Sequence, residues 1–203
     1  MDDYNDSLEL RNSIIDSYEL AKISNADIGE TVTYGNYNGS IEWIVLDKKD
    51  NSVFVASKYA IEKRPYNIHL GPMTWEECSL RNWMNETFFA SAFSENEQAR
   101  IVETTNVNMD NAMHDTDGGN DTVDRVFLLS LGEVLIYFRT ENSRKAVLSD
   151  GTQVSWWIRL PGGFSNCAAD IGFDGSVSKY GVSVDDYTVA VRPAMWIDIS
   201  NIE

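Results

Sequence analysis

The chain has 203 residues, enough for one domain with a substantial core, and its 43% hydrophobic and 24% charged residues exclude bulk disorder. Its 32 acidic and 16 basic residues give a formal net charge of −16. A field of this sign repels nucleic acid and anionic membrane and attracts cations or basic partners, although the same charge can serve solubility alone. We therefore expect no nucleic-acid binding. No apolar run approaches the roughly 18 residues of a membrane span, so we expect no membrane insertion either.

The N-terminal segment, MDDYNDSLELRNSIIDSYELAK, is acidic and polar. It lacks the basic and apolar regions of a secretory signal peptide. We therefore expect a cytoplasmic protein as the chain stands. A surface or secreted location would follow if a signal segment had been trimmed from it.

A helix is predicted over residues 6–22, where apolar residues recur at intervals of four, four and three. We expect this helix to pack as an appendage, so that residues 1–27 form a helical arm and residues 28–203 form the main domain. The predicted apolar stripe consists of Leu10, Ile14, Tyr18 and Ala21.

After Glu30 the pattern changes to short β-rich runs separated by turn residues. The turns are expected at residues 36–39 and 47–51. This alternation predicts an antiparallel meander, whose strands are Thr31–Tyr34, Ile41–Leu46 and Val53–Ala56.

Three capping boxes predict helix starts, because a Ser or Thr hydroxyl and a Glu carboxylate three residues later satisfy free backbone amides there. The first box is expected to open a helix with Leu80 and Phe88 on its apolar face. The second opens a short helix toward Val102, and the third a helix that ends at about Phe138. The boxes are Thr74–Glu77, Ser94–Glu97 and Ser130–Glu133.

The C-terminal third returns to strands and turns. SWWIRLPGG predicts one strand, and Phe173-Asp-Gly175 predicts a hairpin turn between two more. YTVAVRPAMWIDI predicts the last strand, in which Pro193 marks a bulge or an edge because proline has no N–H to donate. We therefore predict a single α+β domain with short, mostly antiparallel twisted sheets and two to three helices, preceded by the N-terminal helix.

Five segments in this order resemble a known bacterial family. They are YGNYNGSIEWIVL, TWEECSLRNWMNETFFASAFSENEQARI, TDGGNDTVDRVFLLSLGEV, WWIRLPGG and DGSVSKYGVSVDDYTVAVRPAMWI. Together they resemble the bacterial domain of unknown function 6273, over about residues 28–199. The resemblance implies a surface or accessory protein and leaves its chemistry open.

The last strands are also similar to the end of C-type-lectin-like domains, in the branch that includes formylglycine-generating-enzyme-like proteins. The similarity rests on the WWIR strand, the small residues Ala168 and Ala169, and the closing VAVRP strand. It implies a C-type-lectin-like fold for residues 28–203, with a compact twisted sheet beside a helical layer. Formylglycine generation needs a close cysteine pair late in the chain, whereas Cys167 has only the distant Cys78, so that activity is disfavoured. Whether the two cysteines are free or paired stays open.

The acidic loop HDTDGGNDTVDR is the first candidate site. Ca²⁺ takes six to eight oxygen ligands from carboxylates, amides and carbonyls, and C-type-lectin-like domains often bind it. The alternative is a turn in which Asp and Asn bond to the backbone and Gly118–Gly119 supplies positive φ, since the spacing does not fit an EF-hand. Asp124 could also pair with Arg125. No cofactor is otherwise required, and the candidate ligands of a structural Ca²⁺ are Asp115, Asp117, Asn120, Asp121 and Asp124.

Adjacent tryptophans in the predicted WWIR strand form the second candidate site. Trp156 and Trp157 point to opposite faces of a strand, so one is expected in the core. The other could face solvent, where an aromatic ring stacks on sugars or holds a cation. The alternative is a strand buried on both faces.

Strand arginines complete the candidate ligand-binding residues. Arg159 and Arg192 lie in predicted strands of a strongly acidic chain. They either neutralise carboxylates such as Asp170 or Asp174, or clamp a bound substrate or ligand.

No catalytic pattern is present: the sequence has no GxSxG, P-loop or GxGxxG motif and only two histidines, His69 and His114. We therefore predict a non-catalytic ligand-binding module for a glycan, a peptide or a protein. The alternative is a scaffold or interaction protein that acts through the N-terminal helix. An enzyme of unknown type is the third hypothesis.

Overall fold

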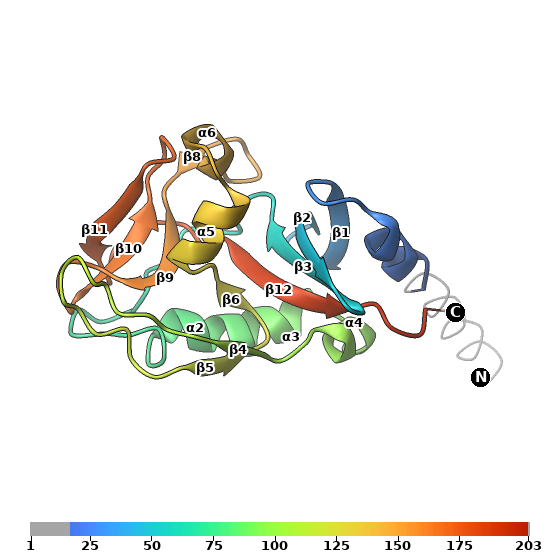
Figure 1. Ribbon diagram of the computed structural model, residues 1–203, viewed down its shortest axis with the longest axis horizontal. Coiled ribbons are helices and arrows are strands. Elements are labelled where there is room, and N and C mark those ends of the chain that lie inside the picture. Colours follow the sequence, from blue (N-terminus) through green and yellow to red (C-terminus); the bar gives the residue numbers. More distant parts are fainter. Residues whose placement is uncertain (1–16, 203) are drawn as a thin grey trace.

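A five-stranded antiparallel sheet forms the centre of the molecule in the computed structural model, which describes residues 17–202 (Figure 1). The strand order is β1-β2-β3-β12-β6, so the last strand of the chain lies between the meander and the short edge strand β6. The predicted meander is confirmed. The strands are β1 (Thr31–Asn36), β2 (Ser40–Lys49), β3 (Ser52–Ser57), β12 (Pro193–Asp198) and β6 (Phe127–Leu128).

The burial patterns of these strands follow their position in the sheet. In β1 exposed and buried residues alternate, as expected for an outer strand with one face toward solvent. In β3 the run Val53–Ala56 is buried throughout, because both faces of this strand are covered. Phe54 stacks between Phe127 and Trp196, whose ring centroids lie 6.0 and 4.9 Å away.

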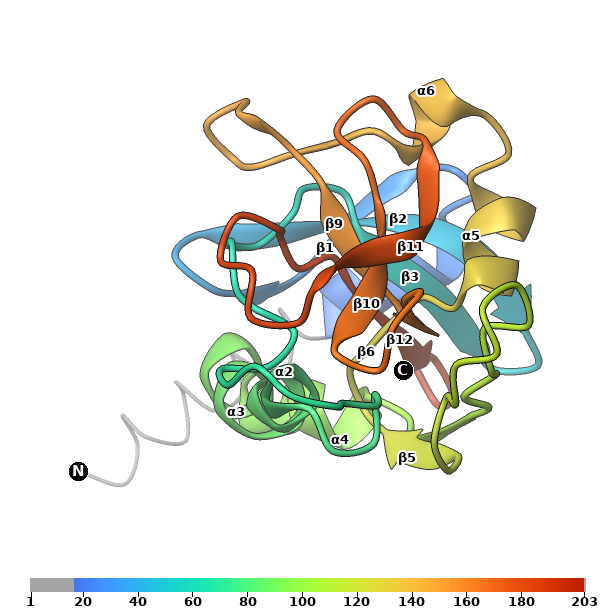
Figure 2. The same cartoon turned by 90° about the vertical axis from the view of Figure 1, so that its left-hand side faces the viewer.

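A second, three-stranded sheet with order β11-β10-β9 stands at the other end of the molecule, in front of the first sheet in Figure 2. The predicted hairpin turn at 173–175 is confirmed, with Gly175 at a φ of 87° between the two hairpin strands. The strands are β9 (Trp156–Pro161), β10 (Cys167–Ile171) and β11 (Val177–Ser183). Two small ladders add β4 (Thr104–Asn106) to β5 (Thr122–Asp124) and β7 (Ala146–Val147) to β8 (Gln153–Val154).

Pro193 lies neither at a bulge nor in an edge strand, contrary to expectation. It is the first residue of β12, opposite Leu128, and β12 pairs with strands on both sides. The first position of a strand tolerates proline because the missing N–H interrupts no further ladder bond. A central strand can therefore begin at this residue.

The described residues hold more helices than the two to three predicted. Three short helical segments run on without a break below β12 and β6 and bury Leu80, Met84 and Phe88 (Figure 1). They are α2 (Ser79–Trp83), the π-helix η1 (Met84–Phe88) and α3 (Phe89–Ala92), followed by α4 (Glu95–Arg100), α5 (Leu131–Tyr137) and α6 (Glu141–Arg144). Together with the antiparallel sheets, these helices confirm the α+β class.

Two of the three predicted capping boxes are confirmed, at Ser94 and Ser130. The box at Thr74 is wrong, because residues 75–77 form a turn and the helix begins later, capped by Cys78. The cause is tertiary: the Trp75 ring is buried and its Nε1 donates to Asp124 at 3.0 Å, which holds this segment away from a helical path. Cys78 and Cys167 are both free, and burial raises the pKa of Cys78 to about 12.

The N-terminal helix is present over residues 17–25, and the rest of the predicted helix lies outside the described residues, with Leu10 and Ile14. The face that packs on the sheet differs from the prediction: Leu20, Ile23 and Ala26 are buried, whereas Tyr18 is exposed. The helix carries two overlapping apolar stripes, and contact with the sheet selects one of them. The boundary at residue 27 stays a prediction, and no helix within residues 17–202 is long and apolar enough to cross a membrane.

Candidate functional site

Asp124 is the centre of a buried polar cluster at the end of the acidic loop. Its carboxylate accepts hydrogen bonds from Arg81 Nε at 2.6 Å, Thr122 Oγ1 at 2.7 Å, Asn106 Nδ2 at 2.9 Å and Trp75 Nε1 at 3.0 Å. These donors fill the roughly four acceptor sites of an ionised carboxylate. Asp124 is therefore a structural anion, which ties β5 to α2 and to β4. We call this group the Asp124 cluster.

The remaining acidic-loop residues turn toward separate partners. Asp117 accepts from the Gly119 amide at 2.8 Å, and Asp121 accepts from the Asn108 amide at 3.1 Å. Asn120 donates to Glu76 at 3.0 Å. The Asp117 contact is the Asx-turn of the alternative interpretation, whereas Asp121 and Asn120 bind partners from distant parts of the chain.

The structure does not bring the predicted calcium ligands together. Asp115 is exposed and adopts a φ of 55°, away from the contacts of Asp117 and Asp121. Among residues 17–202 no group of three or more His, Cys, Asp or Glu side chains is placed to hold a metal ion. The predicted pairing of Asp124 with Arg125 is also wrong, because Arg125 instead binds Glu103 at 2.6 Å.

Trp156 and Trp157 are both fully buried, so the alternative of a strand buried on both faces is confirmed. Both faces of β9 are covered: Trp156 packs against Phe138 and Trp157 against Tyr66. Each indole N–H donates to a backbone carbonyl at 2.8 Å. Neither ring is open to stack on a sugar.

Arg192 belongs to the core. Its Nε donates to the Ser57 carbonyl at 2.8 Å, and its guanidinium lies 4.4 and 5.1 Å from the ring centroids of Phe138 and Trp156. Burial lowers the pKa of Arg192 to about 10. Enclosed by aromatic rings, this side chain stabilises the interior and is closed to a ligand.

The predicted pairing of the strand arginines with Asp170 or Asp174 is wrong. Asp174 accepts from Ser176 within its own turn, and Asp170 has one buried oxygen with no partner among the described residues. Burial, with a smaller contribution from the nearby Asp186 carboxylate, raises the pKa of Asp170 to about 6. Neither strand arginine is therefore paired with Asp170 or Asp174.

Arg159 is buried with most of its donors unpaired. Its side chain is 3% exposed, and its closest acceptor is Glu133, at 3.4 Å from Nη2. Glu133 makes a shorter bond of 2.6 Å to the Ser130 amide, because it closes the capping box of α5. Within the described residues Nε and Nη1 have no acceptor. Burial lowers the pKa of Arg159, and the Glu133 carboxylate opposes this effect.

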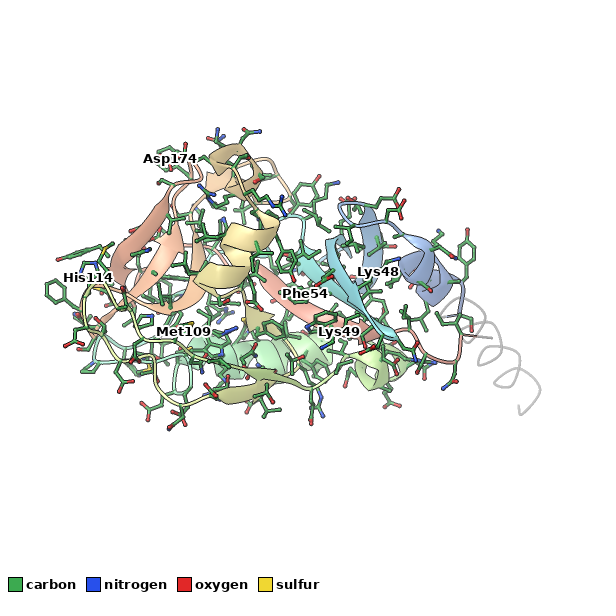
Figure 3. The ribbon with its side chains drawn as sticks, in the orientation of Figure 1. Lys48, Lys49, Phe54, Met109, His114 and Asp174 are labelled. Atoms are coloured by element: carbon green, nitrogen blue, oxygen red, sulfur yellow. The ribbon has the colours of Figure 1, made fainter. Side chains whose placement is uncertain are left out.

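A groove of about 270 Å³ lies beside Arg159, between the loop of residues 109–113 and the first turns of α5. Figure 2 shows this loop next to α5, and Figure 3 labels Met109 on it. Arg159 and Lys179 are the cationic side chains that line the groove, with Asp110 as the carboxylate. Its apolar lining comes from Met109, Met113, Leu131, Leu135 and Leu160.

Hydrogen bonds to the sheet hold the groove loop in place. Asn111 is buried, and its Nδ2 donates to the carbonyls of Pro161 at 2.9 Å and Lys179 at 2.8 Å. Asp110 accepts from the Gly118 amide at 2.9 Å, so the acidic loop braces the groove loop from behind. The groove wall is therefore preformed by the fold.

The residues that line the groove were mostly not predicted from the sequence. Of the four predicted ligand-binding residues, Arg159 alone lines the groove. The segment NVNMDNAM, which supplies the groove loop, matches no motif. Its pair of methionines in an otherwise polar loop is the signal that could have drawn attention, because exposed methionines are common at adaptable binding surfaces.

Neither the curated proteins nor the solved structures with which the chain was compared include a match. Residues 50–199 match the model of the family described as "Domain of unknown function (DUF6273)". The match begins after β2, whereas the resemblance noted in the sequence began near residue 28. The matched residues include the whole groove and the Asp124 cluster. Because it covers more than half of the 203 residues, this chain belongs to the DUF6273 family.

Proposed function

We propose that this chain is a non-catalytic binding module whose ligand occupies the groove between residues 109–113 and α5. The observation that carries the proposal is Arg159, a guanidinium with two unpaired nitrogens at the side of an apolar groove. A buried charge without full hydrogen bonding costs free energy in the folded protein. A ligand acceptor that reaches one of these nitrogens from the groove would offset that cost.

The lining indicates the chemistry of the ligand. Methionine and leucine side chains favour an apolar group, whereas a guanidinium favours a carboxylate or a similar planar anion. Small-molecule sites have this composition, mostly apolar with a few polar groups that set orientation. The net charge of −16 disfavours polyanions, so we propose a ligand with one negative charge.

The similarity of the last strands to C-type-lectin-like domains supports the same proposal, because such domains bind ligands on loops beside a twisted sheet. Fold likeness alone is a weak argument for function. The groove loop is bonded to β9 and β11. The alternative of a scaffold has less support in the described residues, since Leu20 and Ile23 of the N-terminal helix are buried against the chain's own core.

The test is an NMR titration of the full chain with three probes that share one apolar arm: 4-phenylbutyrate, 4-phenylbutanol and 4-phenylbutylamine. We expect the carboxylate to shift the amide signals of residues 109–113 and 131–135 and to bind more tightly than the other two. Arg159→Met should weaken the binding of 4-phenylbutyrate by about tenfold to a hundredfold, the loss typical of a hydrogen bond to a charged group.

Arg125→Met is the matched control, because it removes one exposed positive charge remote from the groove lining and should leave the titration unchanged. Binding of the amine as tightly as the carboxylate would contradict the proposal. So would an Arg159→Met protein that binds like the wild type, or a groove whose signals none of the probes moves.

A further inference from the structure

An exposed aromatic cluster lies on the chain segments that follow the groove lining. Tyr180 lies edge-to-face with both His114 and Phe164, at centroid distances of 5.6 and 5.4 Å. Tyr180 is 53% exposed and Phe164 57% exposed. Figure 3 labels His114 at this end of the molecule. We call these three rings the aromatic ridge.

The ridge and the groove are built from the same two chain segments. Met113 lines the groove and His114 follows it in the ridge, while Lys179 lines the groove and Tyr180 follows it. Tyr180 also lies close against the backbone, since a Cβ at Gly163 would come 2.7 Å from its ring. The two features are therefore neighbours along both segments, and the Tyr180 ring is supported by the backbone at Gly163.

The volume of the groove limits the size of the group that it can enclose. A volume of about 270 Å³ falls just below the range of roughly 300–1,000 Å³ that is usual for sites enclosing whole drug-sized ligands. It suits one large apolar side chain. The remainder of a larger ligand would then lie across the ridge, where exposed aromatic rings offer contact area.

We propose that this surface binds the C-terminal end of a polypeptide, an inference that rests on the function proposed above. The last side chain enters the groove, the terminal carboxylate pairs with Arg159, and the preceding residues cross the aromatic ridge. A chain terminus fits because it carries one carboxylate and one side chain on the same carbon. This matches a single buried guanidinium beside apolar walls.

The surrounding charge indicates which residues precede the terminus. Asp110, Asp115 and Asp117 belong to the groove and acidic loops, and Asp115 and Asp117 are exposed. Carboxylates at the rim favour basic residues in the ligand and speed their encounter. The partner is thus a polypeptide with lysine or arginine a few residues before an apolar C-terminal residue.

The experiment uses isothermal titration calorimetry on the full chain with an octapeptide that has two upstream lysines and a C-terminal leucine. It is compared with its C-terminal amide and with a version that ends in glycine. We expect the free acid to bind at least about tenfold more tightly than either, as expected for a charged hydrogen bond and a buried leucine side chain. In Arg159→Met the acid and the amide should bind equally.

Two further variants keep the test independent of folding effects. Arg159→Lys retains the charge but loses the two-pronged donor, so the preference for the free acid should shrink without disappearing. Tyr180→Ser should weaken the binding of the free-acid peptide and of the amide peptide by the same factor, because it removes only a contact with the aromatic ridge. Thermal melting of each variant establishes that it is folded before titration.

The outcomes separate this inference from the proposed function. If 4-phenylbutyrate binds at the groove and none of the peptides binds, the C-terminal inference fails and the binding module stands. If the amide binds as tightly as the acid, recognition of the terminus also fails. If neither the peptides nor the small carboxylate bind, both proposals fail.

Discussion

The Asp124 cluster and the Arg159 groove place two buried charges in opposite situations. Asp124 accepts four hydrogen bonds, including one from its counter-ion Arg81, all supplied by the chain. Arg159 has one contact of 3.4 Å and two unpaired nitrogens. Buried polar groups in proteins are normally paired, so the paired charge has a structural role, and the unpaired one beside a groove is where we propose that a ligand binds.

The two regions are joined by the acidic loop. The segment that ends at Asp124 passes directly behind the groove loop, where a Cβ on Gly118 would come 2.5 Å from the Met109 carbonyl. Only glycine permits this approach. The loop therefore connects a rigid polar anchor to the wall of the groove, a structural role that requires no metal ion.

The largest effect is expected from Arg81→Met, which leaves the Asp124 carboxylate buried without its cation. Breaking a buried ion pair by removing one partner typically costs about 3–5 kcal/mol, and the three neutral donors that remain place this case near the lower end. Urea unfolding measures the change. Arg125→Met, which breaks an exposed pair, serves as the control and should cost less than about 1 kcal/mol. Equal losses in the two variants would remove the distinction between the Asp124 cluster and an ordinary surface pair.

An intermediate effect is expected at Asp170, a buried carboxyl with no cationic partner. Its pKa is raised from 3.8 to about 6, so between these values the native state binds more protons than the unfolded state. Its contribution to the free energy of unfolding therefore falls as the pH rises from about 4 to 6, and the penalty is complete above that window. Asp170→Asn should stabilise the protein at pH 7 by about 1–2 kcal/mol and leave it little changed at pH 4.

The difference between variant and wild type isolates this group from the other acidic residues. Melting curves at pH 4, 5, 6 and 7 give the comparison. A difference that stays constant across the series would show that Asp170 titrates at its ordinary value.

The smallest effect on stability is expected from Arg159→Met. The side chain forms only the long contact to Glu133, and a neutral side chain of similar length removes the cost of burying a charge. The free energy of unfolding in urea should change by less than about 1 kcal/mol, in the direction of greater stability. A loss as large as that of Arg81→Met would mean that Arg159 is a structural charge after all.

Much of the local structure could be predicted from the sequence. The meander, the hairpin turn at Gly175 and the helices that start after Ser94 and Ser130 all depend on neighbours within a few residues. The failure at Thr74 has the opposite origin. The capping box at Thr74 competes with burial of the Trp75 ring, which bonds to the distant Asp124. Burying a large aromatic ring stabilises the protein more than a helix cap does.

By itself, the sequence determined the α+β class and the short-range elements, because hydrophobic period, caps and turns act over a few positions. The resemblance of five segments indicated the family. Only the tertiary structure decided which charges are paired. Arg81 reaches Asp124 across 43 positions, whereas Arg159 has no comparable partner and lies beside a loop from residues 109–113. Whether two charged side chains pair depends on their distance in the folded protein, and neither composition nor sequence spacing gives that distance. The acidic loop, rich in apparent ligands, is therefore a brace, and a single strand arginine marks the candidate site.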